Sequence, residues 1–251
     1  MDRLIDWGAP WLAHLRPLQA LLRSAAWRTA LSEAARERRV VSGYDVPIEF
    51  VEHDAAGKMP YELFIATTGR VPTRDNLHDR FNALIWLAYP RAKAALNARQ
   101  AAELERNGVG PARGAVRDAA TLIDESAVLL RCPDDQVAAA LAGHDWQRLL
   151  IDWRGRWGRD ILALPFGHAL LEKLGGPFKA ITACAVPLPA VVDVDAVAAT
   201  FIARSDLAPS LLPHLPVLGI PGWCAENADP RFYDDPRVFR PRRRDRSLRS
   251  E

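Results

Sequence analysis

Hydrophobic residues recur at helical spacing between Gly69 and Asn97, and an unusual variety of polar and aromatic residues accompanies them. At about 100° per residue, the rotation of an α-helix, one apolar stripe forms. Its members are Leu77, Phe81, Leu84, Ile85 and Ala88. The flank beside this stripe carries His78, Asp79, Asn82, Trp86 and Tyr89. A half-covered flank can hold polar groups in one orientation and still expose them to a ligand, so the pattern predicts a helix with a candidate site. The alternative is that His78 and Asn82 only satisfy buried backbone groups nearby.

Two prolines divide this stretch. Pro72 favours an extended chain before the first helix, because proline disfavours helix in the residue that precedes it. Pro90 suits the first turn of a second helix, where its missing N–H is not needed. This second helix carries Lys93, Asn97 and Gln100 on one face. We therefore expect two helices that meet at an angle at Pro90.

Shorter patterns flank these helices. Leucines at helical spacing predict one kinked helix or two over residues 10–38. Alternation and β-favouring composition predict a hairpin at about 46–68 and a second at about 121–130, with Asp124-Glu125-Ser126 as its turn. Such a turn needs no chemistry from Asp124 or Glu125. Helices are predicted at 134–142 and 145–153, one or two more within 158–176, a strand near 181–188, and a helix that begins near Asp193.

Together these elements predict an α+β fold, a predominantly helical single domain over residues 1–241 with two short β-hairpins. Its N-terminal part, residues 1–40, is expected to be helical. The segment from Leu215 onwards, rich in proline, glycine and aromatic residues, is expected to wrap around the domain in ordered turns.

A second candidate site lies in the segment PFGHALLEKL. His168 and Glu172 are four residues apart and therefore share one face of a helix. Such a pair can bind a metal ion or relay a proton, although it is also common on exposed helices. Gly167 adds weight, because a residue without a side chain lets another backbone approach closely beside His168.

Composition and charge narrow the class of protein. The chain is 49% hydrophobic and 25% charged, as expected of a soluble globular protein, and no apolar run approaches the roughly 18 residues of a membrane span. The three cysteines, Cys132, Cys184 and Cys224, are widely separated and form neither a disulfide framework nor a CxxC metal motif. Cys184 lies in a run of small residues and is expected to be buried. A cytoplasmic location is the simplest expectation.

The formal net charge of +2 conceals two oppositely charged parts. Residues 237–251 contain seven arginines against Asp245 and Glu251, which leaves 26 basic and 29 acidic residues elsewhere, a balance of −3. That body lacks the basic surplus of a nucleic-acid-binding domain. Residues 242–251 are expected to be a disordered basic tail, the one part suited to contact nucleic acid or an anionic surface.

The chain contains none of the motifs GxxxxGK[ST], GxGxxG before a helix, HExxH or GxSxG, which argues against nucleotide-dependent and serine-hydrolase classes. It resembles the DUF3025 family of uncharacterised bacterial proteins over most of residues 60–241. The resemblance rests on four blocks: YELFIATTGRVPTRDNLHDRFNALIWLAYPRAKAALN, RDAATLIDES, PFGHALLEKL and LPVLGIPGWCAENADPRFYDDPRVFRPRR. It implies family membership and no particular activity.

Two functions of different classes follow as hypotheses. The first is metal-assisted or general acid/base hydrolysis, because imidazole and carboxylate ligands suit divalent zinc, manganese or magnesium. The catalytic candidates are His78, Asp79, Asn82, Lys93 and His168, with Asn82 orienting the substrate and Lys93 balancing its charge. The metal-ligand candidates are His78, Asp79, Asp124, Glu125, His168 and Glu172. This hypothesis requires several of these side chains to meet in one cleft.

The second hypothesis is a non-catalytic binding or assembly protein. Trp86, Trp153, Trp157 and Trp223 would then form an aromatic surface, since tryptophan is a common anchor residue at interfaces. Under this hypothesis His78 and Asn82 are structural. It requires an exposed aromatic patch, with the polar residues hydrogen-bonded internally.

Overall fold

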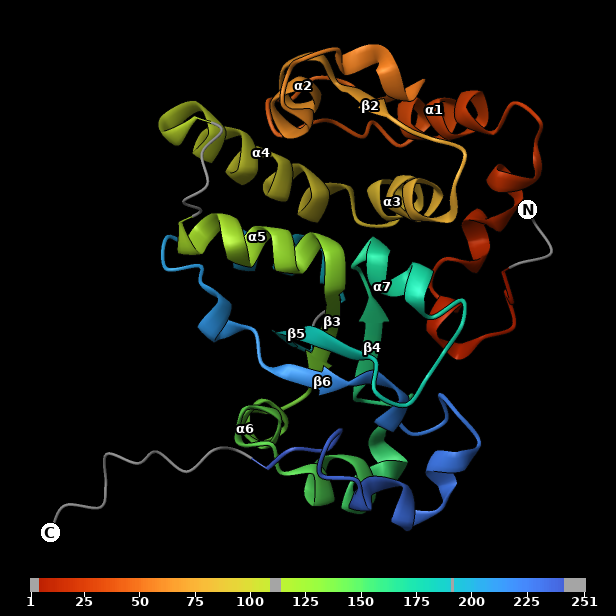
Figure 1. Cartoon of the computed structure of the whole chain (residues 1–251), viewed down its shortest axis with the longest axis vertical. Helices are drawn as coiled ribbons and strands as arrows, with labels where there is room; N and C mark the ends of the chain where they lie inside the picture. Colours follow the sequence, from red (N-terminus) through yellow and green to blue (C-terminus); the bar gives the residue numbers. More distant parts are fainter. Residues whose placement is uncertain (1–4, 109–113, 191, 242–251) are drawn as a thin grey trace, which may run out of the picture.

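The computed structural model describes residues 5–108, 114–190 and 192–241, in which helices surround two small β-sheets (Figure 1). The α+β, mainly helical class predicted from the sequence is confirmed. The predicted basic tail, residues 242–251, lies outside the described residues. No described helix is both long and apolar enough to cross a membrane.

The N-terminal part consists of two 3-10 helices, η2 (Pro10–Leu12) and η3 (Arg16–Arg23), and the helix α1 (Trp27–Glu37). Two short strands follow, β1 (Glu49–Val51) and β2 (Arg70–Pro72), which pair in parallel. A 3-10 turn, η4 (His53–Ala56), and the helix α2 (Tyr61–Thr68) connect them. This parallel connection replaces the predicted hairpin at 46–68.

The prediction of a strand in the segment YELFIATT is wrong for a physical reason. Pro60 precedes the first turn of α2, and Gly69 ends the helix in the left-handed conformation at φ +69°. Three consecutive residues of the helix, Phe64, Ile65 and Ala66, are buried, so no alternation separates an inner from an outer face. Tertiary packing here outweighs a composition that favours strands.

Three helices lie below α1 and α2 in Figure 1: α3 (Leu77–Ala88), α4 (Pro90–Asn107) and α5 (Ala115–Ser126). The predicted pair of helices meeting at Pro90 is confirmed. Asn76 caps α3 by accepting a hydrogen bond of 2.8 Å from the backbone N–H of Asp79. The buried surface of α3 is wider than the predicted stripe, because every residue from Arg80 to Leu87 is buried. Asn82 and Trp86 therefore lie inside the protein.

The larger sheet has the strand order β4-β3-β5-β6. Its strands are β3 (Ala127–Cys132), β4 (Leu162–Pro165), β5 (Thr182–Pro189) and β6 (His214–Pro216). β3 runs parallel to β5 and antiparallel to β4, and β5 runs antiparallel to β6. The predicted hairpin at 121–130 is wrong, because residues 121–126 are the end of α5 and β3 finds its partners elsewhere. The expected strand near 181–188 is confirmed as β5.

The remaining helices are α6 (Asp135–Gly143), α7 (His168–Lys173) and α8 (Val194–Ile202). A π-helical turn, η5 (Gln147–Asp152), stands where a helix over 145–153 was predicted, and η6 (Arg154–Arg156) follows it. The helical prediction over 158–176 is correct only for α7, since β4 occupies its first half. A 3-10 turn, η7 (Pro209–Leu211), follows α8. The segment from Leu215 onwards makes further 3-10 turns, as expected of an ordered wrap: η8 (Val217–Gly219), η9 (Glu226–Ala228) and η10 (Pro230–Asp234).

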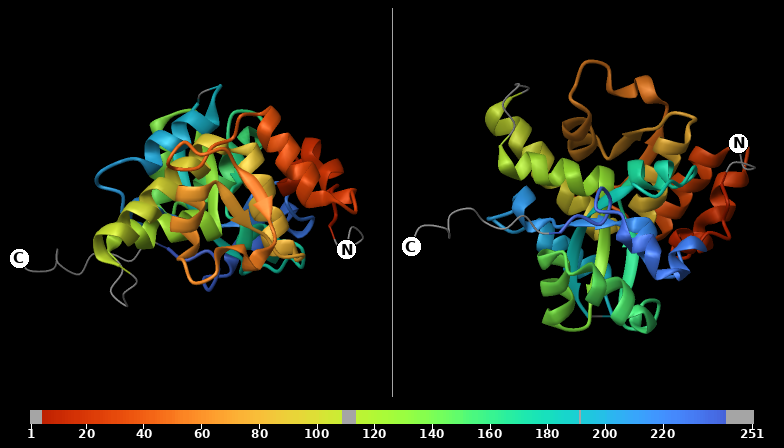
Figure 2. Two further views of the ribbon diagram at one scale, coloured as in Figure 1. Left: turned by 90° about the horizontal axis from the view of Figure 1, so that it is seen from above. Right: turned by 60° about the horizontal axis from the view of Figure 1, so that its bottom comes forward.

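The larger sheet is the middle layer of the protein, with a hydrophobic core on each face. Side chains of β3 alternate between the two cores: Leu129 packs with the N-terminal and central helices, whereas Val128 and Leu130 pack with α6 and the C-terminal segment. Part of the N-terminal segment lies beside the C-terminal segment (Figure 2), and the rings of Trp11 and Trp223 are 5.9 Å apart. The junction of α3, α5 and α7 lies above this sheet (Figure 1).

Candidate functional site

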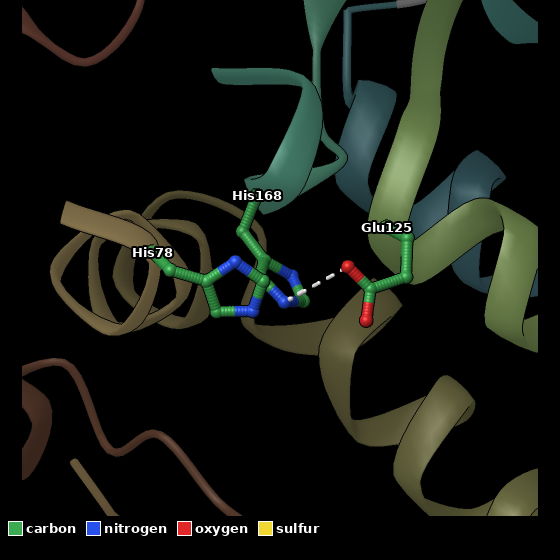
Figure 3. Close-up of side chains that lie close together, drawn as sticks. All are labelled: His78, Glu125 and His168. Carbon is green, nitrogen blue, oxygen red and sulfur yellow. Dashed lines mark ion pairs between the residues drawn. The ribbon is translucent and has the colours of Figure 1, made fainter. Parts of the chain in front are cut away.

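Three side chains from three different helices converge at this junction: His78, Glu125 and His168 (Figure 3). One ligand atom from each lies within 4.8 Å of the other two. His78 is in the first turn of α3, Glu125 is in the last turn of α5, and His168 is the first residue of α7. The imidazole rings meet edge to face, with their centroids 4.3 Å apart.

Gly167 explains why α5 and α7 approach so closely. A Cβ atom at this position would lie 2.4 Å from the backbone nitrogen of Ser126 and 2.5 Å from the carbonyl oxygen of Glu125. The Gly167 N–H also donates a hydrogen bond of 2.9 Å to the carbonyl of Ala127. The predicted close backbone approach at Gly167 is confirmed, and it brings Glu125 to His168.

Each imidazole contacts a further carboxylate. His78 Nδ1 lies 3.0 Å from Glu172 Oε2, within hydrogen-bond distance. His168 Nε2 lies 3.4 Å from Glu125 Oε2, and His168 Nδ1 lies 3.8 Å from Asp124 Oδ1. The Nδ1 of His168 is buried and has no side-chain hydrogen-bond partner among the described residues, although the Asp124 carboxylate lies close to it.

A buried polar chain supports Asp124 from behind. Lys93 Nζ donates hydrogen bonds to Asp124 Oδ1 at 2.5 Å and to Asn82 Oδ1 at 2.9 Å. Asn82 Nδ2 in turn donates to the Tyr61 hydroxyl at 3.3 Å. This chain accounts for the polar residues found on the inner sides of α3 and α4, whose burial requires partners.

The electrostatic balance of the cluster follows from these contacts. Burial alone would raise the pKa of Asp124, but the opposing effects of Lys93, His168 and His78, with Lys93 the strongest, together hold that pKa below its usual value. Burial lowers the pKa of His168 to about 4, against the opposing effect of Asp124. Burial and the Asp124 charge both raise the pKa of Glu125. His168 is therefore neutral at physiological pH, which is the form of imidazole that binds metal ions.

A cavity of about 270 Å³ adjoins the cluster. The residues predicted from the sequence that line it are His78, Asp79, Asn82, Asp124, Glu125 and His168. Their expected convergence in one cleft is thus observed. The wall also contains side chains that sequence reasoning missed: His53, Tyr61, Glu62 and Arg74. Burial, reinforced by the charge of Asp124, raises the pKa of Glu62 to about 7.

Tyr61 and Glu62 were not predicted as site residues, because the sequence pattern assigns their segment to a strand. In the structure they belong to the first turn of α2, after Pro60, and line the same cavity as His78 in the first turn of α3. Pro60 is the sequence signal that could have indicated this helix start. Arg74 and His53 lie in connecting segments on either side of β2 and α2, where no periodicity predicts their direction.

Three predicted site residues lie apart from the cluster's centre. Lys93 does not line the cavity, so its expected contact with a substrate is not supported; it neutralises Asp124 instead. Glu172 lies behind His78 rather than in the cavity wall. Asp79 lines the cavity, but its Oδ2 atom accepts a hydrogen bond of 2.6 Å from the backbone N–H of Arg74 and holds the connection before α3.

The four tryptophans considered as an aromatic surface do not form one. Trp86, Trp157 and Trp223 are buried, with Trp86 only 1% exposed, and Trp153 is half-buried. They contribute to the two cores because indole rings bury a large apolar area. Cys184 is buried, as expected, and burial raises the pKa of its thiol to about 11.

Fold and site together define an α+β protein in which two imidazoles and a carboxylate face a polar cavity between helices. A family model described as "Protein of unknown function (DUF3025)" matches residues 48–243, and the chain belongs to this family. Comparisons with curated proteins and with solved structures gave no match.

Proposed function

We propose that His78, Glu125 and His168 bind one divalent transition-metal ion, and that the protein uses this ion to hydrolyse a substrate held in the adjoining cavity. The observation that carries the proposal is the cluster itself, in which ligand atoms of the three side chains lie within 4.8 Å of one another. Two imidazoles and one carboxylate are a ligand set of catalytic zinc sites, and three protein ligands leave a coordination position for water.

The carboxylates behind the two imidazoles support the same proposal. Glu172 Oε2 is 3.0 Å from His78 Nδ1, and Asp124 Oδ1 is 3.8 Å from His168 Nδ1. Carboxylates at this position orient metal-binding histidines and raise their basicity. The Nε2 atoms of both rings then remain for the metal ion. The buried Lys93 ammonium compensates the negative charge of Asp124.

A metal ion bound here would lower the pKa of a bound water molecule and so supply a nucleophile at neutral pH. The Glu62 carboxylate lines the same cavity and is our candidate for the group that accepts the proton of this water. Asn82 and Arg74, which also line the cavity, would orient a polar substrate.

Elemental analysis of the purified protein tests the metal part of the proposal, with His78→Ala as the variant and His53→Ala as its matched control. His53 is an exposed imidazole of the same cavity but lies outside the cluster. We expect about one equivalent of a transition metal in the wild type and in His53→Ala, as for a single three-ligand site. His78→Ala should lose the metal and unfold at nearly the same temperature as the wild type in metal-free buffer, because the His78 side chain is 35% exposed.

A wild type that binds no transition metal, together with a His78→Ala variant that merely melts lower, would overturn the metal site and leave His78 structural. The hydrolytic part is tested separately with chromogenic esters and phosphate esters, with and without added metal. A protein that holds the metal but cleaves none of them would instead support the alternative of a non-catalytic binding protein.

A further inference from the structure

A second cavity, of about 510 Å³, is larger than the one beside the histidine cluster. The end of α5, the strands β5 and β6, and the C-terminal segment contribute its walls. Its lining is largely apolar and includes Leu122, Trp146, Ala183 and Leu212. A volume of this size lies within the range of about 300–1,000 Å³ typical of small-molecule sites, which are mostly apolar with a few polar groups.

The charges that line this cavity are all of one sign. Arg237 and Arg240 contribute to its wall, and none of the described residues that line it is an aspartate or glutamate. The cavity beside the histidine cluster differs sharply, since four carboxylates line it. Both arginines come from the same short segment of the wall. An anionic group is the ligand chemistry that complements them.

The arginine-bearing segment is attached to the cavity wall. Trp146 Nε1 donates a hydrogen bond of 2.8 Å to the carbonyl oxygen of Arg240, and Arg240 Nε donates to the carbonyl of Arg237 at 3.0 Å. The Arg237 side chain is 89% exposed, and its Nε atom lies 3.3 Å from Asp235 Oδ1. This long, exposed contact leaves the guanidinium able to bind a second anion.

His144 is the third feature that indicates a ligand site. It lies in the cavity wall with its ring stacked on Trp146 at a centroid distance of 5.1 Å. Its Nδ1 atom is buried and has no hydrogen-bond partner among the described residues. Its backbone, at φ +55°, has the left-handed conformation with which α6 ends, and this turn directs the chain towards Trp146.

Covalent chemistry does not fit this cavity. Its thiol and hydroxyl side chains are Cys184, Ser126 and Thr182, but burial raises the pKa of the Cys184 thiol to about 11, and the Thr182 hydroxyl donates to the carbonyl of Ala180 at 3.3 Å. The Ser126 hydroxyl donates to the carbonyl of Leu122 at 3.0 Å, and no described imidazole or carboxylate hydrogen-bonds to it. The lining therefore suits reversible binding.

We propose that this cavity is a binding site for a small amphipathic carboxylate. The apolar body of the ligand would pack against Leu122, Leu212 and the Trp146 ring, and its carboxylate would bind Arg237 and Arg240. This proposal is independent of the metal site, because the linings of the two cavities share none of the described residues.

Isothermal titration calorimetry of the full chain with octanoate tests the proposal, and octanamide serves as the uncharged analogue of the same size. We expect octanoate to bind at a stoichiometry of about one, and octanamide to bind at least about tenfold more weakly because it cannot form charge-assisted hydrogen bonds. The double variant Arg237→Gln/Arg240→Gln should lose a similar factor. Arg231→Gln, which removes an exposed arginine outside the cavity, should bind like the wild type.

A second variant tests the location. Thr182 is an exposed residue of the cavity wall, so Thr182→Phe fills the space without disturbing the core. We expect Thr182→Phe to abolish octanoate binding and to keep the wild-type unfolding temperature. The proposal is overturned by any of three results: no binding of octanoate at millimolar concentration, equal binding of octanoate and octanamide, or binding unchanged in Arg237→Gln/Arg240→Gln and in Thr182→Phe.

Discussion

Replacing Lys93 by methionine should destabilise the protein strongly, because it would leave a buried carboxylate without its counter-charge. The side chains of Lys93 and Asp124 are 4% and 10% exposed, and Lys93 Nζ lies 2.5 Å from Asp124 Oδ1. This ion pair compensates the negative charge of Asp124. Asp124 also interacts unfavourably with Glu62 and Glu125, so loss of the ammonium would leave three carboxylates close together. Breaking a buried pair from one side costs about 3–5 kcal/mol.

For a chain of this size, each kcal/mol corresponds to roughly 2–4 °C in Tm, so Lys93→Met should melt roughly 6–20 °C below the wild type. Thermal and urea unfolding of the metal-free protein would measure the change. The double variant Lys93→Met/Asp124→Asn removes both charges and should be more stable than Lys93→Met alone, with a coupling of about 2 kcal/mol or more.

The control is Lys179→Met, which breaks a looser Lys–Asp pair of 3.7 Å with Asp235. Because the Lys179 side chain is 35% exposed, we expect a loss of less than about 1 kcal/mol. A loss below about 1 kcal/mol in Lys93→Met, or strictly additive effects of the two site variants, would refute the reasoning that Asp124 is a buried anion held by Lys93.

Three further outcomes are expected. Burial lowers the pKa of His14 to about 4 in the folded protein, below its unfolded value near 6.5. The folded state therefore disfavours protonated His14, so its contribution to stability is complete above about pH 6.5. This contribution, up to about 3 kcal/mol, is lost as pH falls towards 4. Urea unfolding of His14→Gln between pH 4 and 7 should therefore show a shallower pH dependence than the wild type. Gly167→Ala should lose at least about 1–3 kcal/mol and weaken metal binding, because its Cβ would meet the Ser126 nitrogen. Glu172→Gln should keep the wild-type Tm but bind zinc about 10–100-fold more weakly, since it frees the ring of His78.

Matched controls accompany these variants. Gly155→Ala adds a methyl group where no atom of the described part of the chain lies within 4 Å, and should leave both Tm and zinc affinity unchanged. Glu37→Gln removes an exposed charge at the end of α1, and should not alter zinc affinity. Wild-type behaviour of Gly167→Ala would show that the helix junction tolerates the extra atom, and wild-type zinc affinity of Glu172→Gln would remove Glu172 from the site. An unchanged pH profile in His14→Gln would remove His14 as a source of acid sensitivity.

The helical periodicity of residues 77–88 was sufficient to predict α3 and the position of His78 beside its apolar side. The glycine before His168 was sufficient to predict a close backbone approach there, because only a missing side chain permits it. Both signals are local in the sequence. Local signals also identified α4, α6, α8 and the strand β5, where length and residue type agree with the final structure.

Long-range pairing explains what could not be predicted. β3 lies between β4 and β5, which begin 35 and 55 residues later in the chain. Local sequence patterns do not reveal such distant partners, so the predicted hairpin paired the residues of β3 with the end of α5 instead. The apolar run of α2 is buried on several sides and carries no helical period, so its helix and the cavity residue Glu62 were missed. Burial of Lys93 was not predicted either, because its partner Asp124 is 31 residues away and was assigned to a turn.

X-ray absorption spectroscopy of the zinc-loaded protein tests the central claim most directly, because it identifies the atoms bound to the metal. Our account predicts two imidazole nitrogens and at least one carboxylate oxygen, at about 2.0–2.2 Å, with a water molecule as a further ligand. In Glu125→Gln, which keeps the size of the side chain and removes its charge, the carboxylate contribution should be lost and zinc should bind more weakly. Zinc surrounded by water alone, by sulfur, or by the same ligands in Glu125→Gln would contradict the proposed site.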